Sequence, residues 1–209
     1  MKKLFLIPVF VALTAFSGFA AAQNADSSTP DGLMKSVTTD VMNTLKADPA
    51  VKKGDIAEIT KLVNEKILPY IDFEHTTRLV MGRNWLNATP EQRTQVIEQF
   101  KLLLIRTYSG ALAQVNNQEI VYKPLRAASD ATDVVVASQV LGQGQPIELD
   151  YRLSKTPNGW RVYDINVLGV WLVQSYQQQF SEQISQHGID GLIQFLTQRN
   201  QQLANGKAS

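Results

Sequence analysis

Cysteine is absent from the 209-residue sequence, and histidine occurs only twice. Without cysteine the chain cannot form a disulfide scaffold, a thiolate metal site or a cysteine nucleophile. Neither His75 nor His187 lies in the His-Glu-x-x-His spacing of a zinc enzyme, and no third ligand is near either one in the sequence. The sequence therefore predicts no metal site and no disulfide framework.

An excess of charge of either sign is also missing. The chain has 20 basic and 19 acidic residues, a formal net charge of +1, and 44% hydrophobic residues. Disordered chains have more charge and less apolar content, and nucleic-acid-binding domains carry a surplus of lysine and arginine. We therefore expect a folded protein with a sizeable core and no nucleic-acid partner.

The one apolar run of unusual length lies at the N-terminus. Lys2 and Lys3 precede an apolar segment, residues 4–16, and a group of small residues ends at Ala22. This order is typical of a secretory signal peptide, and the run is shorter than the roughly 20 residues that span a membrane. We expect cleavage of residues 1–22 near Ala22 rather than an uncleaved anchor, which leaves residues 23–209 as a single domain.

The expected export and the missing cysteine together predict a location. A bacterial lipoprotein needs a cysteine at its cleavage site to carry lipid, and this chain has none. We therefore expect a freely diffusing protein of a bacterial periplasm, with secretion beyond the outer membrane left open.

Apolar residues recur at helical spacing in the first and last parts of the mature chain. Leu33, Val37, Val41 and Leu45 are four residues apart, as on one face of a helix. The residues that begin at Thr89 match a capping box, which marks a helix start. These patterns predict helices over residues 30–47, 56–67, 73–81, 90–115, 170–186 and 189–203.

Between the helices the apolar period changes from 3.6 to 2. Residues 145–154 alternate strictly between apolar and polar side chains, which is typical of a strand with one dry face. The turn residues 157–159 predict a hairpin with the next strand. Strands are expected over residues 119–125, 133–141, 145–154 and 160–168, so the order of elements predicts an α+β fold with one twisted antiparallel sheet.

Asp164 is the one candidate for acid–base catalysis, because it lies inside an apolar strand. A carboxylate that faces a cavity can act as a general base in isomerases built on a cone-shaped α+β fold. The alternative is a structural aspartate that pairs with Arg152 or Arg161, or with backbone N–H groups. No second polar partner is evident, and the structural role is favoured.

The remaining pattern is apolar. Aromatic residues such as Tyr108, Trp160 and Phe180 punctuate segments rich in valine, isoleucine and leucine. Periodicity alone does not distinguish a solid core from the lining of a cavity, so both interpretations stay open on this evidence.

Three segments, taken together and in order, resemble a known family. They are LPYIDF at 68–73 with ATPEQR at 88–93, WRVYDI at 160–165 before a Gly-Val pair, and GIDGL at 188–192. They are similar to the MlaC family, the periplasmic phospholipid-binding proteins of the toluene-tolerance (Mla) transport system. The resemblance extends from about Leu33 to Leu203.

The resemblance implies a fold and a function. Members have a cone-shaped (NTF2-like) α+β fold, here expected as a twisted antiparallel sheet of about four strands wrapped by about six helices. An apolar cavity holds the acyl chains of a phospholipid, which is cargo rather than a cofactor, and there is no covalent chemistry. The expected partners are the MlaA–porin complex and MlaD of the MlaFEDB transporter, and a shuttle between them is expected to be a monomer.

The resemblance and the strand pattern also give candidate lipid-binding residues. Tyr108, Ile147 and Val170 match positions that line the family's lipid site, and Leu149 and Tyr151 share the dry face of a strand with Ile147. Leu104, Val136, Trp171, Val173 and Phe180 complete the set. Which face of strand 160–168 lines the cavity is not fixed by the sequence.

Two residues depart from the family pattern. Trp171 stands where the family has a small residue after Gly-Val, and Gln177 stands where an arginine is frequent. The choice of phospholipid is therefore left open. Two other hypotheses remain beside the lipid carrier, namely an isomerase-like enzyme that uses Asp164 and a periplasmic interaction protein with a solid core.

Overall fold

The computed structural model describes residues 28–115, 118–142 and 144–206, so the predicted signal peptide lies outside the described residues. In chain order the elements are α1 (Pro30–Ala47), α2 (Pro49–Lys52), α3 (Ile56–Leu62), the π-helical turn η1 (Val63–Ile67), the 3-10 turn η2 (Leu68–Tyr70), α4 (Phe73–Met81), α5 (Asn84–Asn87), α6 (Pro90–Ala113), β1 (Glu119–Tyr122), β2 (Asp133–Leu141), β3 (Ile147–Thr156), β4 (Gly159–Val167), β5 (Val170–Trp171) and α7 (Leu172–Ala204). This order confirms the predicted α+β class.

The strands form a single antiparallel meander in the order β1-β2-β3-β4-β5. The predicted hairpin between β3 and β4 is confirmed, because Thr156 pairs with Gly159 at its end. The sheet has five strands rather than about four. The additional strand, β5, has two residues, which the sequence pattern assigns to the start of the helix predicted over residues 170–186.

Helix starts follow the capping chemistry of the sequence. Thr89 and Gln92 form the predicted capping box at the start of α6, each side chain bonded to the other residue's backbone N–H. Asp72 accepts a hydrogen bond from the N–H of His75 and caps α4. Gly188, at φ 71°, interrupts α7 where the sequence predicts a break between two helices. Within the described ranges, none of the helices has the length and apolar content needed to cross a membrane.

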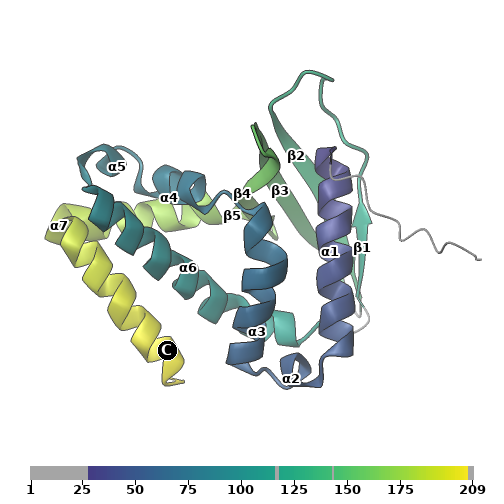
Figure 1. Ribbon diagram of the computed structural model, residues 1–209, viewed down its shortest axis with the longest axis horizontal. Helices are drawn as coiled ribbons and strands as arrows, with labels where there is room; N and C mark the ends of the chain where they lie inside the picture. Colours follow the sequence, from purple (N-terminus) through teal and green to yellow (C-terminus); the bar gives the residue numbers. More distant parts are fainter. Residues whose placement is uncertain (1–27, 116–117, 143, 207–209) are drawn as a thin grey trace, which may run out of the picture.

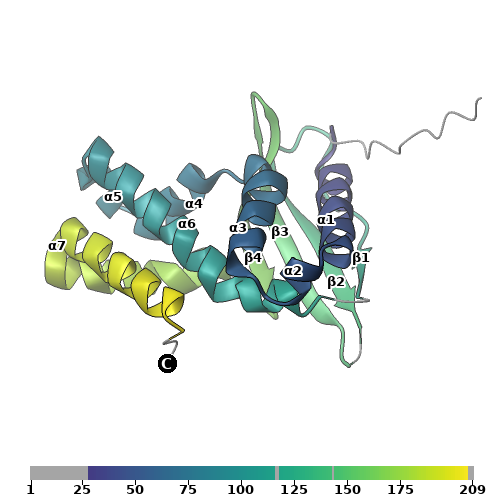
Figure 2. The same cartoon turned by 60° about the horizontal axis from the view of Figure 1, so that its bottom comes forward.

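The buried apolar residues form two clusters, and the elements that carry them lie in two groups, with α1 and α3 beside the sheet and α4 to α7 away from its β1 edge (Figures 1 and 2). In the first, α1, α3 and η1 pack on one side of the sheet. In the second, α4, α5, α6 and α7 pack together, with Phe100, Phe180 and Leu196 at the centre. Helix α6 joins the two, because its N-terminal part lies in the second cluster and Ile105 lies in the first.

A β-bulge in β4 decides which residues face inward. Arg152 pairs with Asp164, but Leu153 pairs with Val162, so Tyr163 has no partner on β3. Strict alternation would place Val162 and Ile165 on opposite faces. The extra residue instead brings both side chains to the inner face of the sheet.

The β4–β5 connection is a two-residue turn with an unusual residue in it. Leu168 (φ 53°) and Gly169 (φ 85°) both have positive φ, as a type I′ turn requires. Glycine and asparagine adopt this conformation readily, whereas leucine does not. Leu168 is also 66% exposed, so packing within the chain does not compensate for the strain.

Leu168→Asn should therefore raise the free energy of unfolding by about 1 kcal/mol, because asparagine tolerates the left-handed region. For a chain of this size the melting temperature should rise by about 2–4 °C, measured by circular dichroism. Leu168→Ala is the control, since it removes the exposed side chain without adding tolerance for positive φ. An equal melting temperature for both variants would contradict the expectation.

Candidate lipid-binding cavity

An apolar cavity of about 270 Å³ lies between α1 and the inner face of the sheet. Its other walls come from η1, η2 and the C-terminal end of α6. Eighteen residues line it: Met34, Val37, Thr38, Val41, Met42, Leu45, Ile67, Tyr70, Ile71, Leu112, Val115, Gln118, Ile120, Val140, Leu149, Tyr151, Val162 and Ile165. Among these described lining residues there is no charged side chain.

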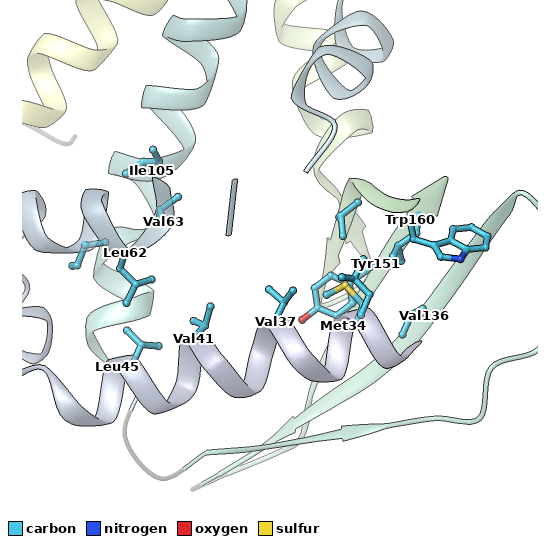
Figure 3. Packing of buried hydrophobic residues seen from close by; sticks show 14 of the residues in the cluster. Met34, Val37, Val41, Leu45, Leu62, Val63, Ile105, Val136, Tyr151 and Trp160 are labelled. Atoms are coloured by element: carbon cyan, nitrogen blue, oxygen red, sulfur yellow. The ribbon is translucent and has the colours of Figure 1, made fainter. Parts of the chain in front are cut away.

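Helix α1 supplies a continuous apolar wall. Met34, Val37, Val41 and Leu45 recur three to four residues apart, and all four line the cavity. Figure 3 shows their side chains pointing from α1 toward Tyr151 and Val136 at one end and toward Leu62 and Val63 at the other. The amphipathic stripe that predicts this helix is therefore also a wall of the cavity.

The sheet supplies the opposite wall through its inner face. Val136, Tyr151 and Ile165 lie side by side across β2, β3 and β4, because Tyr151 pairs with the other two. The bulge adds Val162 to the same face. Residue Ile71 forms a parallel bridge to Val162, which brings η2 against β4 and closes this side of the cavity.

Polar groups at the cavity are buried or hydrogen-bonded to other parts of the protein. Burial raises the pKa of the Tyr151 hydroxyl well above its ordinary value, so the phenol is neutral. The hydroxyl of Tyr122 hydrogen-bonds to Thr38 Oγ1 at 2.8 Å and donates to the carbonyl of Met34 at 3.0 Å. Burial raises the pKa of Tyr122 to about 12. The cavity is therefore lined mainly by apolar side chains and can hold hydrocarbon.

Comparison with known proteins agrees with this geometry. The MlaC protein family matches residues 35–198 of the chain. The chain belongs to the MlaC family. The MlaC-family resemblance drawn from the sequence segments is thereby confirmed.

Two curated relatives are similar over most of their length. The toluene tolerance protein ttg2D of Pseudomonas putida is 27% identical over 184 residues, which cover 87% of this chain and 83% of that protein. The intermembrane phospholipid transport system binding protein MlaC of Haemophilus influenzae is 26% identical over 197 residues, which cover 92% and 91%.

A solved structure is more similar still. The phospholipid-binding protein from Ralstonia solanacearum, determined in complex with a phospholipid, is 52% identical to this chain. The two superpose with a TM-score of 0.82, covering 83% of this chain and 98% of that one. This MlaC-family chain therefore shares its fold with a protein whose structure contains a bound phospholipid.

The predicted lipid-binding residues fall into three groups in the structure. Leu149 and Tyr151 line the cavity, and Val136 lies buried beside Tyr151. Leu104, Val173 and Phe180 pack in the second cluster, with α4, α6 and α7. Tyr108, Ile147, Val170 and Trp171 lie outside both groups.

The third group is mostly exposed apolar surface. Tyr108, Ile147 and Val170, which the resemblance predicts to line the lipid site, are 37%, 43% and 56% exposed. Ile147 pairs with the lining residue Val140, and Val170 pairs with Val167, which pairs with the lining residue Leu149. Ile147 and Val170 therefore lie on the inner face of the sheet, beyond the cavity. Trp171 instead stacks under the guanidinium of Arg152, at 3.9 Å.

Sequence reasoning missed the helical half of the cavity. The lining residues of α1, η1 and η2, such as Val37 and Ile67, follow helical periodicity, and that pattern is the same for a solid core. The sequence therefore carries no signal that separates the α1 stripe from a helix face that packs on a solid core.

Asp164 has a structural role and is not among the cavity residues. Its carboxylate lies 3.1 Å from Arg152 Nη1 and accepts hydrogen bonds from the N–H groups of Ile165 at 2.9 Å and Val173 at 3.0 Å. The bond to Val173 caps the start of α7. Burial raises the pKa of the Asp164 carboxyl above its ordinary value, and the two N–H donors and Arg152 oppose that effect.

Asp164→Ala should lower the free energy of unfolding by about 2–3 kcal/mol, because two backbone N–H groups would lose their acceptor in a buried place. Urea denaturation measures the change. Asp164→Asn is the matched control, since its amide oxygen can still accept both bonds and its loss should be smaller. Equal destabilisation by the two variants would show that the charge, not the acceptor, matters.

The wild type and the Asp164→Asn variant together test the protonation of Asp164. Its folded-state pKa lies above the ordinary value of 3.8. The folded state therefore binds the proton more tightly than the unfolded state does. This tighter binding adds to the free energy of unfolding below pH 3.8, and the gain is lost as pH rises through the folded-state pKa. The stability of the wild type relative to Asp164→Asn should fall across that window. A rise would mean that attraction to Arg152 outweighs burial.

Proposed function

We propose that this protein is a periplasmic phospholipid carrier, which holds acyl chains in the cavity under α1 and shuttles lipid between outer-membrane and inner-membrane Mla complexes to maintain outer-membrane lipid asymmetry. The observation that carries the proposal is the uncharged cavity between α1 and the sheet. It is supported by the 52% identical relative that was determined with a phospholipid.

The cavity is suited to hydrocarbon by its lining and its size. A methylene group and a water molecule are similar in volume, so 270 Å³ holds about nine methylenes at about 30 Å³ each. Burial of about nine methylenes at about 0.8 kcal/mol each contributes about 7 kcal/mol to binding. The cavity in this form holds part of one acyl chain, so a phospholipid with two chains requires additional space.

The exposed inner-face residues offer a path for the remaining hydrocarbon. Ile147 and Val170 continue the apolar surface of the sheet beyond Leu149. The part of an acyl chain that does not fit in the cavity would extend along this face and cover both side chains. Their role in lipid binding, and that of Tyr108, remains a prediction from the family resemblance.

A binding role, rather than catalysis, fits the chemistry of the site. Asp164, the candidate base, has its oxygens engaged by Arg152 and by the backbone at α7. Among the described residues no three metal-binding side chains lie together. Phospholipid would be bound as cargo and released unchanged.

The partners and the location belong to the same proposal. Lipid would pass between the MlaA–porin complex at the outer membrane and MlaD of the inner-membrane MlaFEDB transporter. The predicted signal peptide would deliver the mature protein to the periplasm between them. Because acyl chains must stay away from water, each transfer requires a partner that offers an apolar path.

Val41→Phe should weaken lipid binding while the protein stays folded, because the larger side chain would take up part of the cavity under α1. The mature protein, residues 23–209, would be produced in a bacterial periplasm and examined by native mass spectrometry for bound phospholipid. The wild type should carry phospholipid, and Val41→Phe should carry clearly less.

Val135→Phe is the matched control, because Val135 is 45% exposed on the outer face of the sheet. This variant should retain phospholipid. A folded Val41→Phe protein with wild-type lipid content would contradict the proposed cavity. A wild-type protein that neither carries lipid nor takes it up from vesicles would contradict the carrier function.

A further inference from the structure

A polar groove runs along the outside of the α1–β1 boundary, next to the apolar cavity. It has a volume of about 540 Å³ and is lined by residues of α1 and of the segment 118–122. Thr38, Met42, Gln118 and Ile120 line both the groove and the cavity. One layer of side chains therefore separates the hydrocarbon space from the groove.

The walls of the cavity differ in how they are held. Strands β1 to β4 are joined by backbone ladders, and η2 is tied to β4 by the hydrogen bond from Asp72 N–H to the carbonyl of Val162, at 2.8 Å. The boundary between α1 and α3 is filled by buried Leu45 and Leu62. The α1–β1 boundary is where a groove takes the place of packed side chains.

Tyr122 holds the α1–β1 boundary together. This residue ends β1, and its hydroxyl reaches Thr38 Oγ1 and the carbonyl of Met34 on α1. Both partners lie in the N-terminal half of α1. The other end of α1 is fixed to α2 through Asp48, whose extended backbone (φ −96°, ψ 110°) interrupts the helix. Loss of the Tyr122 bonds would remove the hydrogen bonds that hold the N-terminal half of α1 to β1, while Asp40 of α1 would stay paired with Lys66 of η1, at 3.0 Å.

The groove also suits the polar end of a phospholipid. Lys35 and Lys46 line it from α1, Glu119 lines it from β1, and Lys46 has no ion pair among the described residues. Lys35 lies 3.0 Å from Asp31 and 6.0 Å from the centre of the Tyr122 ring. Since Lys35 and Lys46 lie about 16 Å apart along α1, a phosphate in the groove would approach one of the two ammonium groups while its acyl chains passed Thr38 and Met42.

From these contacts we infer that phospholipid enters and leaves between α1 and β1, and that the Tyr122 hydroxyl is the latch that keeps this boundary closed. The inference rests on the proposed function and adds the route. Opening the boundary also enlarges the cavity, which supplies space that the closed form lacks for a second acyl chain.

The latch is tested by removing one oxygen atom. Tyr122→Phe should exchange phospholipid about five- to a hundredfold faster than the wild type, the range expected for loss of two hydrogen bonds. Exchange is measured as transfer of fluorescent phosphatidylethanolamine between vesicles of phosphatidylethanolamine and phosphatidylglycerol. Tyr163→Phe is the matched control, because its hydroxyl bonds to Asp133 away from α1, at 3.0 Å. An equal rate for both variants would overturn the latch.

The route is tested by closing the boundary covalently. The chain has no cysteine, so a bis-maleimide with a short spacer would link only an introduced pair. Thr39 and Val121 line the groove from its two sides, and Thr39→Cys with Val121→Cys would bridge α1 and β1. Thr39→Cys with Asn43→Cys is the control, because both residues lie one turn apart on α1.

The bridge across the boundary should slow exchange at least tenfold, whereas the bridge within α1 should leave the rate unchanged. Exchange at the control rate with the boundary bridged would overturn the route but not the carrier function. A protein that takes up no phospholipid in any form would overturn the carrier function and the route together.

Discussion

The β-bulge at Tyr163 is the constraint on which both halves of the molecule depend. The unpaired residue turns Val162 and Ile165 to the cavity, where regular alternation would separate them. It also leaves the carbonyl of Tyr163 to accept the Thr76 hydroxyl at 2.8 Å, and the Asp164 carboxylate to hold the start of α7. One inserted residue thus shapes the apolar wall on one face and docks the helical cluster on the other.

An apolar cavity inside a folded domain has an energetic cost. Protein interiors are close-packed, and side chains around empty space lose contacts that a solid core would make. The second cluster places Phe100 and Phe180 edge to face, with ring centroids 5.0 Å apart, and supplies stability away from the cavity. The division into two clusters therefore separates the packing of α4, α6 and α7 from the cavity wall that α1 forms.

The sequence predicted the elements better than their assembly. The cap at Thr89 and the break at Gly188 are local chemistry and lie where predicted. The bulge and the two-residue strand β5 depend on pairing between distant segments, so periodicity did not reveal them. For the same reason Leu149 was assigned to the cavity from strand alternation, whereas Val37 and Ile67 were not, since a helical stripe is identical over a core and over a cavity.

The absence of charge from the cavity lining has a consequence for cargo choice. Hydrocarbon offers no polar group to recognise, so such a cavity distinguishes lipids by the length and shape of their chains. Lysines in the adjacent groove meet a phosphate that every phospholipid carries. The proposed carrier would therefore sample its donor membrane in proportion to what is present there, and the mixture that it delivers would report the composition of the membrane that loaded it.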